Sequence, residues 1–239
     1  MANIYYNAPC ELYQGFLEDD KTFRSVLTRI TDFILYDRCQ VKNRSLEEEE
    51  IREIGSEELG VEYNDPIYAW KQGKKLYQKY IDEPRNSPAF FSLSKSAYWH
   101  FREEETTEWE RAVLLAYLAI KSMVGKREMI KTNMLLICLR MEGHTRSRGH
   151  SLSPATEKFT NRYWKDRLMR SLFECYNVTF YGGTKAHKVR GFFCSTRLTM
   201  EQLIIKAEAL MEAERNKPKD PLMEAKRLAM QKINNGVHL

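Results

Sequence analysis

The order of structural signals in the second half of this chain restricts its fold more than any other feature. "TTEWERAVLLAYLAIKSMVG" and "KTNMLLICLRMEG" are predicted helices, and the first opens with the capping-box pair Thr107 and Glu110. A polar loop, "HTRSRGHSLSPA", leads to a third predicted helix, "TEKFTNRYWKDRLMRSLFECY". Two β-prone runs, "VTFY" and "GFFCS", then flank a turn-rich segment. The sequence therefore predicts three helices followed by a two-stranded hairpin.

The first part of the chain is predicted to be helical as well. "FLEDDKTFRSVLTRITDFILYDRC" is amphipathic, "SLEEEEIREIGSEEL" is an acidic helix with carboxylates around its whole circumference, and "NDPIYAWKQGKKLYQKYID" has Asp65 as cap before Pro66. The apolar stripe of the first helix comprises Phe23, Val26, Leu27, Ile30, Phe33 and Ile34.

A stretch rich in Pro, Asn and Ser, "DEPRNSPAFF", marks the best boundary in the chain. We therefore predict a helical N-terminal domain over residues 1–85, a second domain over 88–215, and a C-terminal tail with a short helix over 216–239. The N-terminal domain is expected to serve regulation, dimerisation or partner binding.

Charge is distributed unevenly along the chain. The net charge is +5, but residues 121–199 carry 16 Lys and Arg against 5 Asp and Glu, whereas residues 1–120 carry 15 against 22. Such segregation is expected of a polyanion-binding part beside an acidic or regulatory part. The alternative is that folding brings the two blocks together so that their charges cancel.

Several classes of protein are excluded or disfavoured by simple patterns. No apolar run reaches the roughly 18 residues of a membrane span, and the N-terminus lacks the pattern of a signal peptide, so we predict a cytoplasmic protein without a membrane partner. The five cysteines are odd in number and form no CxxC, which predicts free thiols, most of them buried. Cys138, His144 and His150 lack the spacing of a zinc finger, and no nucleotide-binding glycine motif occurs, so we predict neither a metal nor a cofactor.

Helix, helix, loop, helix and hairpin is the order of a winged helix, in which the third helix enters the major groove of DNA and the hairpin contacts the adjacent backbone. The predicted fold class is therefore mainly α with a small β-hairpin, a winged helix-turn-helix preceded by a helical N-terminal domain. The partner that this fold and the basic block predict is double-stranded DNA, because cations placed near phosphates gain affinity by releasing counterions.

The predicted DNA-binding residues lie in the polar loop, the third helix and the hairpin. They are Arg146, Arg148, Lys158, Asn161, Arg162, Tyr163, Lys165, Arg170, Lys185, His187, Lys188 and Arg190. The cations are expected on phosphates, whereas sequence would be read by side chains such as Asn161, Arg162 or Tyr163 on base edges.

The hydrophobic pattern over residues 88–197 resembles the winged-helix domains of plasmid and phage replication initiators and of DnaD-like replisome organisers. The stretches that carry this resemblance are "FFSLSKSAYWHF", "WERAVLLAYLAIKSM", "KTNMLLICLRM" and "NRYWKDRLMRSLFECYNV". The resemblance implies a DNA-binding role in replication initiation or transcriptional regulation, for example of a mobile genetic element. One departure is the long loop before the third helix.

Two other functions stay open. One is a non-enzymatic protein–protein adaptor that uses a winged-helix fold, with the acidic N-terminal part as a docking surface or a site of homodimerisation. The other is an enzyme; "HKVR" at 187–190 satisfies the bare His-x-x-Arg pattern of tyrosine integrases but lacks the remaining residues. The Glu-rich "REEETTEWE" is explained by the preference of carboxylates for a helix start, so we predict no enzyme.

Overall fold

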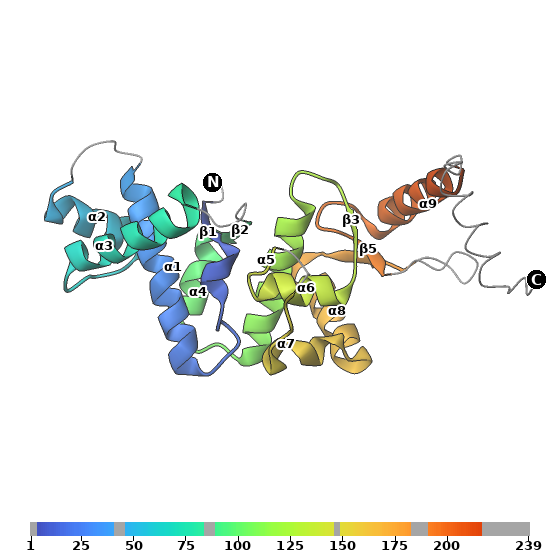
Figure 1. Cartoon of the computed structure of the whole chain (residues 1–239), viewed down its shortest axis with the longest axis horizontal. Helices are drawn as coiled ribbons and strands as arrows, with labels where there is room; N and C mark the ends of the chain where they lie inside the picture. The colour runs from blue at the N-terminus through green and yellow to red at the C-terminus, as the bar shows by residue number, and fades with distance from the viewer. Residues whose placement is uncertain (1–3, 41–45, 84–88, 146–148, 183–190, 217–239) are drawn as a thin grey trace, which may run out of the picture.

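The computed structural model describes residues 4–40, 46–83, 89–145, 149–182 and 191–216. Within these residues the chain is mainly helical, with two small antiparallel sheets (Figure 1). The α-helices are α1 (Asp20–Gln40), α2 (Glu48–Leu59), α3 (Pro66–Tyr77), α4 (Lys95–Glu103), α5 (Glu108–Val124), α6 (Met134–Met141), α7 (Pro154–Glu157), α8 (Arg162–Tyr176) and α9 (Met200–Asn216). The strands are β1 (Tyr5–Pro9), β2 (Phe90–Ser94), β3 (Ile130–Thr132), β4 (Thr179–Tyr181) and β5 (Phe192–Ser195). Short 3-10 turns at Cys10–Tyr13 and Lys158–Thr160 and a π-turn at Gln78–Asp82 complete the described elements.

The first three helices form where the sequence predicts them. All six residues of the apolar stripe of α1 are buried, and α3 begins after Asp65, whose side chain accepts a hydrogen bond from Tyr68 N at 2.7 Å. Helix α1 packs along α3, with Phe33 stacked on Tyr77 and Tyr36 against Trp70. The two helices approach closely because α3 has a buried glycine at the crossing, Gly73.

The start of the chain pairs with the segment that follows the predicted domain boundary. Strands β1 and β2 are antiparallel, with Tyr5 opposite Ser94 and Pro9 opposite Phe90. One core cluster of buried residues extends from Tyr6 to Cys194, so it includes side chains from both predicted domains. This sheet was not expected from the sequence, and the division into 1–85, 88–215 and 216–239 stays a prediction.

The second half of the chain is arranged around α5. This helix is buried on most of its circumference and contacts β2, α6, α8 and β5. Strand β5 lies between β3 and β4 and is antiparallel to both, which gives the sheet order β3-β5-β4. The predicted capping box of Thr107 and Glu110 is present, and Asn133 caps α6 by accepting from Leu136 N at 3.0 Å. The two β-prone runs of the predicted hairpin are β4 and β5, and the turn between them lies outside the described residues.

The prediction of the third helix is wrong in one respect, because the structure divides this stretch into separate elements. Residues 154–160 form α7 and a 3-10 turn, and α8 begins only at Arg162. Asn161 separates them with an extended backbone, φ −67° and ψ 143°, and its side chain accepts a hydrogen bond from Tyr163 N at 3.0 Å. An Asn in this conformation begins a new helix instead of continuing the previous one.

Two further sequence predictions concern cysteines and the membrane. Cys10, Cys39, Cys138 and Cys194 are buried free thiols, as expected, whereas Cys175 near the end of α8 is exposed. Across the part of the chain that the structure describes, none of the helices combines the length and apolar character needed to cross a bilayer.

We predict that Gly73→Ala destabilises the packing of α1 on α3. A Cβ at position 73 would overlap the carbonyl oxygen of Asp32 and lie 2.8 Å from Tyr36 Cβ, so the helices would have to separate. The free energy of unfolding should fall by at least ~2 kcal/mol in urea denaturation, since overpacking of this kind displaces backbone. Gly182→Ala is the matched control, because nothing lies within 4 Å of an added Cβ there. Equal stability of the two variants would contradict the close approach.

A second prediction concerns the buried carboxyl of Asp32 on α1. Burial raises the pKa of Asp32 to about 7, above the value of about 3.9 in an unfolded chain. The unfolded state therefore loses this proton first as pH rises, so the contribution of the group to stability is complete below about pH 4 and is lost between about pH 4 and 7. Asp32→Asn should be more stable than wild type at about pH 8, by at most ~4 kcal/mol, and no more stable at about pH 3.5.

Thermal and urea unfolding across this pH range gives the free energy of unfolding of wild type and of Asp32→Asn. The other titrating groups are the same in both proteins, so their contributions cancel in the difference. Asp82→Asn, at an exposed position after α3, is the control and should alter stability little at either pH. A difference that does not change with pH would show that Asp32 ionises in the folded protein at its ordinary pKa.

Candidate nucleic-acid interface

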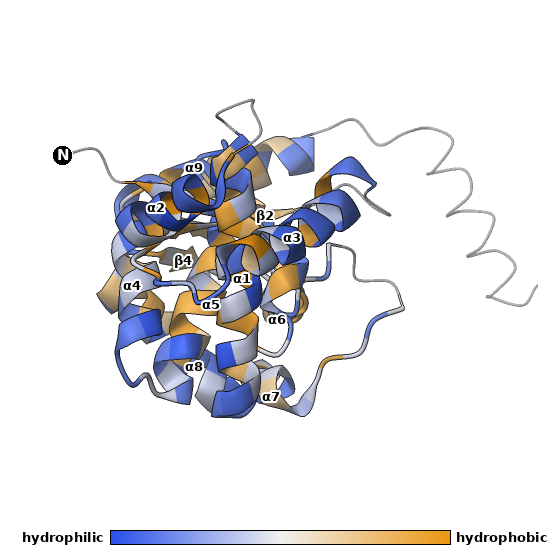
Figure 2. Cartoon of the chain, turned by 90° about the vertical axis from the view of Figure 1, so that its left-hand side faces the viewer, coloured by the Kyte–Doolittle hydropathy of each residue, from blue (hydrophilic) through white to orange (hydrophobic). Residues whose placement is uncertain are grey.

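Helix α8 presents one buried face and one polar face. Leu168 and Leu172 are buried, and α8 packs on α5 through this side. The opposite face is exposed along its length; its exposed residues are Arg162, Tyr163, Asp166, Arg167, Arg170, Phe173 and Glu174. Figure 2 shows hydrophilic and hydrophobic residues side by side on α8, as in an amphipathic helix.

The structure brings four of the predicted DNA-binding residues together on α8. Arg162, Tyr163 and Arg170 are exposed, and the side chain of Arg162 is 92% accessible. Arg162 Nε and Lys165 Nζ each lie 3.8 Å from an oxygen of Asp166. One carboxylate thus partly balances two of the cations, and the face keeps a net positive charge because Arg167 and Arg170 outnumber Glu174.

Two predicted residues have structural contacts that compete with DNA binding. Asn161 uses its side-chain oxygen to cap α8, so that oxygen is not free for a base edge. Lys158 lies in the 3-10 turn before α8, not in the helix, and its ammonium pairs with Glu108 at the start of α5. Lys158 also lies over the ring of Trp164, 5.9 Å from its centroid.

The remaining predicted residues cannot be placed on this surface. Arg146 and Arg148 of the polar loop, and Lys185, His187, Lys188 and Arg190 of the hairpin, lie outside the described residues. The ends of the hairpin strands are described: Tyr181 on β4 pairs with Phe193 on β5, and the Phe180 and Phe192 rings meet edge to face at 5.6 Å.

Arg167 is a surface cation that was not predicted from the sequence. Its guanidinium lies 4.1 Å from the ring centroid of Trp109 on α5 and 5.5 Å from that of Trp164. Tyr163 contacts Trp164 edge to face at 5.3 Å. The spacing of three between Trp164 and Arg167 was a usable signal, because residues three apart are neighbours on a helix. The contact with Trp109 had no such signal in the sequence, because Trp109 is distant from Arg167 along the chain.

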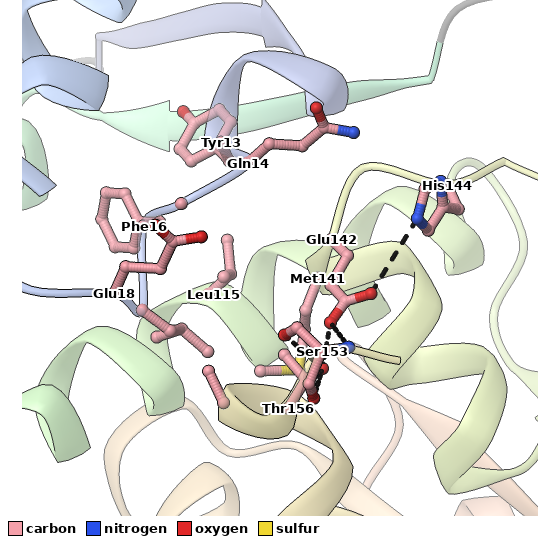
Figure 3. A pocket seen from close by; sticks show the side chains of 13 residues that line it. Tyr13, Gln14, Phe16, Glu18, Leu115, Met141, Glu142, His144, Ser153 and Thr156 are labelled. Atoms are coloured by element: carbon pink, nitrogen blue, oxygen red, sulfur yellow. Dashed lines mark hydrogen bonds and ion pairs between the residues drawn. The ribbon is translucent and has the colours of Figure 1, made fainter. Parts of the chain in front are cut away.

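A pocket of about 190 Å³ lies between the segment 13–18 and the region around the end of α6 and the start of α7 (Figure 3). Glu142 lines this pocket, and its side chain is only 14% exposed. Its Oε1 accepts hydrogen bonds from Ser153 N at 2.7 Å and from the Thr156 hydroxyl, and its Oε2 lies 3.9 Å from His144 Nε2. The carboxylate therefore fixes the start of α7 to the end of α6.

The histidines beside this pocket do not form a metal site. His144 and His150 stack with ring centroids 3.9 Å apart, and burial together with His150 lowers the pKa of His144. Within the described ranges, no group of three or more His, Cys, Asp or Glu side chains is placed to hold a metal ion. Cys138 is buried in α6, which is the structural role expected from its apolar helix.

No protein-family model, curated protein or solved structure matches this chain. The resemblance to replication initiators therefore stays a prediction from hydrophobic pattern.

We predict that Glu142→Ala loosens the junction between α6 and α7. The change removes the acceptor of the Ser153 N–H, which typically costs about 1–3 kcal/mol for a donor left unpaired, and one of the partners of the buried Thr156 hydroxyl, which keeps the carbonyl oxygen of Ser153 at 3.3 Å. The midpoint of urea unfolding should fall accordingly. Glu157→Ala, an exposed carboxylate on α7 itself, is the matched control and should change the midpoint little. Identical midpoints for Glu142→Ala and wild type would show that these bonds are replaced by water.

Proposed function

We propose that residues 107–195 form a winged helix and that the protein binds double-stranded DNA through it. The observation that carries the proposal is the order α5, β3, α6, α8, β4, β5 combined with the sheet order β3-β5-β4. A winged helix has this connectivity: a strand between its first two helices pairs with the last strand of the hairpin. Helix α7 and the 3-10 turn are an insertion before the third helix.

The exposed face of α8 supports the assignment of this helix to the major groove. It is 15 residues long, stands on α5 through its apolar side, and leaves Arg162, Arg167 and Arg170 accessible. Arginine forks donate to phosphates and to the O6 and N7 atoms of guanine, so such a face can both position the protein and read bases.

The composition of the hairpin supports the same function. Lys185, Lys188 and Arg190 belong to the segment that connects β4 to β5, which is the wing of this fold. Binding is either sequence-specific or directed to the backbone, in replication initiation or transcriptional regulation. The N-terminal helices α1–α3 then serve contacts with a protein partner or a second copy, and the protein performs no catalysis.

The test is duplex binding by the full chain, measured as fluorescence anisotropy at two salt concentrations. The double variant Arg162→Ala/Arg170→Ala should bind a random duplex at least ten-fold more weakly, and the slope of log affinity against log salt should fall by up to about 1.8, about 0.9 for each phosphate that is no longer neutralised. Lys71→Ala/Lys75→Ala removes the same charge from exposed positions on α3 and should leave the slope unchanged. The triple alanine variant of Lys185, Lys188 and Arg190 extends the test to the wing.

A change of opposite sign makes this test sharper. Asp166→Asn removes the carboxylate between Arg162 and Lys165, so it should strengthen duplex binding. Undetectable duplex binding, or a loss that is equal in the α3 control, would refute the DNA-binding proposal.

The second candidate, a protein–protein adaptor, is favoured by one observation on α9. Leu203, Ala207 and Met211 of this helix are buried against the second sheet, whereas Ile205 and Leu210 are 68% and 48% exposed. These two side chains would be covered if α9 packed against a partner protein. If the protein fails to bind duplex DNA at low salt, the adaptor function is better supported than the DNA-binding function.

A further inference from the structure

A groove of about 670 Å³ lies between the first sheet and the C-terminal end of α5, away from the surface of α8 described above. Its volume is within the range of about 300–1,000 Å³ that is common for small-ligand sites. Three aromatic rings and two cations line it: Tyr5, Phe90, Tyr117, Lys121 and Arg197. The other lining residues are small or carry hydroxyls, and none of the described residues that line it is acidic.

Lys121 is held inside this groove without a carboxylate partner among the described residues. Its Nζ lies 4.2 Å from the ring centroid of Tyr5 and 5.7 Å from that of Tyr117, and it donates to the carbonyl oxygen of Ser92 at 3.3 Å. Partial burial lowers the pKa of Lys121, which means that its charged form is incompletely solvated. A bound anion would restore the stabilisation that water no longer provides.

Arg197 is fixed at the edge of the same groove. Its two terminal nitrogens donate to the carbonyl oxygens of Lys126 at 3.0 Å and Gly125 at 2.7 Å, at the C-terminal end of α5. A guanidinium has five N–H donors, so these bonds orient the group and leave donors for a ligand. The carbonyl oxygens at the C-terminal end of α5 thus hold the guanidinium in place, and its remaining donors can bind an anion such as phosphate.

The rings provide surfaces on which a planar group can stack. Tyr5 is 40% and Phe90 39% exposed, although both belong to the strands of the first sheet. Tyr117 is held rigidly by Tyr176, with centroids 4.2 Å apart and planes 8° from parallel. Since Tyr5 pairs with Ser94 and Phe90 with Pro9, the backbone positions of Tyr5 and Phe90 lie four residues apart along the ladder, about 13 Å.

We propose that this groove binds nucleotides, with bases stacked on Tyr5 and Phe90 and a phosphate held by Lys121 and Arg197. Aromatic rings beside cations are the recurring chemistry of sites for single-stranded nucleic acid. A single strand and a free mononucleotide share this chemistry, and the presence of two exposed rings on the ladder favours the strand, because a strand has a base for each ring and a mononucleotide has only one base. The groove is distinct from the proposed duplex surface, because none of the described residues that line it belongs to α8.

The experiment is anisotropy of a labelled oligothymidylate of about 12 nucleotides, a length within the known site sizes for single strands. The full chain should bind it, and Lys121→Gln and Tyr5→Ala should each weaken binding about ten-fold. Lys74→Gln is the matched control, because Lys74 Nζ lies similarly over a ring, 5.4 Å from the centroid of Trp70, but outside the groove. Circular dichroism of each variant verifies the fold, and the two groove variants change different elements, so misfolding of one leaves the other decisive.

Competition and a second probe separate the outcomes. Displacement of the oligonucleotide by millimolar AMP would support a mononucleotide site, whereas failure of AMP with retained oligonucleotide binding would support a strand site. Arg162→Ala/Arg170→Ala should keep its affinity for the oligothymidylate, and Lys121→Gln should keep its affinity for duplex DNA, so the groove and the duplex surface can fail independently. Absence of binding to both the oligonucleotide and AMP, or equal affinities of wild type, Lys121→Gln and Tyr5→Ala, would overturn the proposal.

Discussion

The burial of α5 is the constraint on which the rest of the structure depends. Its apolar residues point in nearly every direction, and they are covered by β2 on one side and by α6, α8 and β5 on others. Strand β2 pairs with β1, so the first sheet packs on one side of α5 while α6 and α8 pack on other sides. Helix α5 therefore joins the N-terminal strand to the helices of the second half. A helix that is apolar on most faces is stable only when surrounded, so α5 requires the N-terminal sheet as well as the helices that follow it.

The helices could be predicted well from the sequence where apolar spacing and caps agree. Asp65, Thr107 and Asn133 mark helix starts by a local hydrogen bond, and local signals of this kind can be read without tertiary context. The sheets were harder to predict from the sequence. Strand β1 pairs with β2, which lies beyond three intervening helices, and β3 has three residues, so their pairing follows from long-range packing that no local pattern encodes.

The candidate DNA surface was predictable in composition but not in charge balance. The basic block of residues 121–199 was visible in the sequence, and the cations of α8 do share a face. The pairing of basic residues with distant carboxylates was not visible in the sequence. Glu108 pairs with Lys158, which is 50 residues away, and this is one instance of the cancellation between acidic and basic blocks that the sequence left open. Asp166, in contrast, follows from helical spacing, since it is four residues after Arg162.

Helix α5 also relates the two proposed sites to each other. Its first turn supplies Glu108 and Trp109 to the surface beneath α8, and its last turns supply Tyr117 and Lys121 to the groove. With 17 residues it is about 25 Å long, and α8 packs along it from Trp164, beside Trp109, to Tyr176, stacked on Tyr117, so the two proposed sites belong to neighbouring parts of one helix pair. A duplex on the exposed face of α8 would leave the groove open to a second segment of nucleic acid, because no described residue that lines the groove belongs to α8.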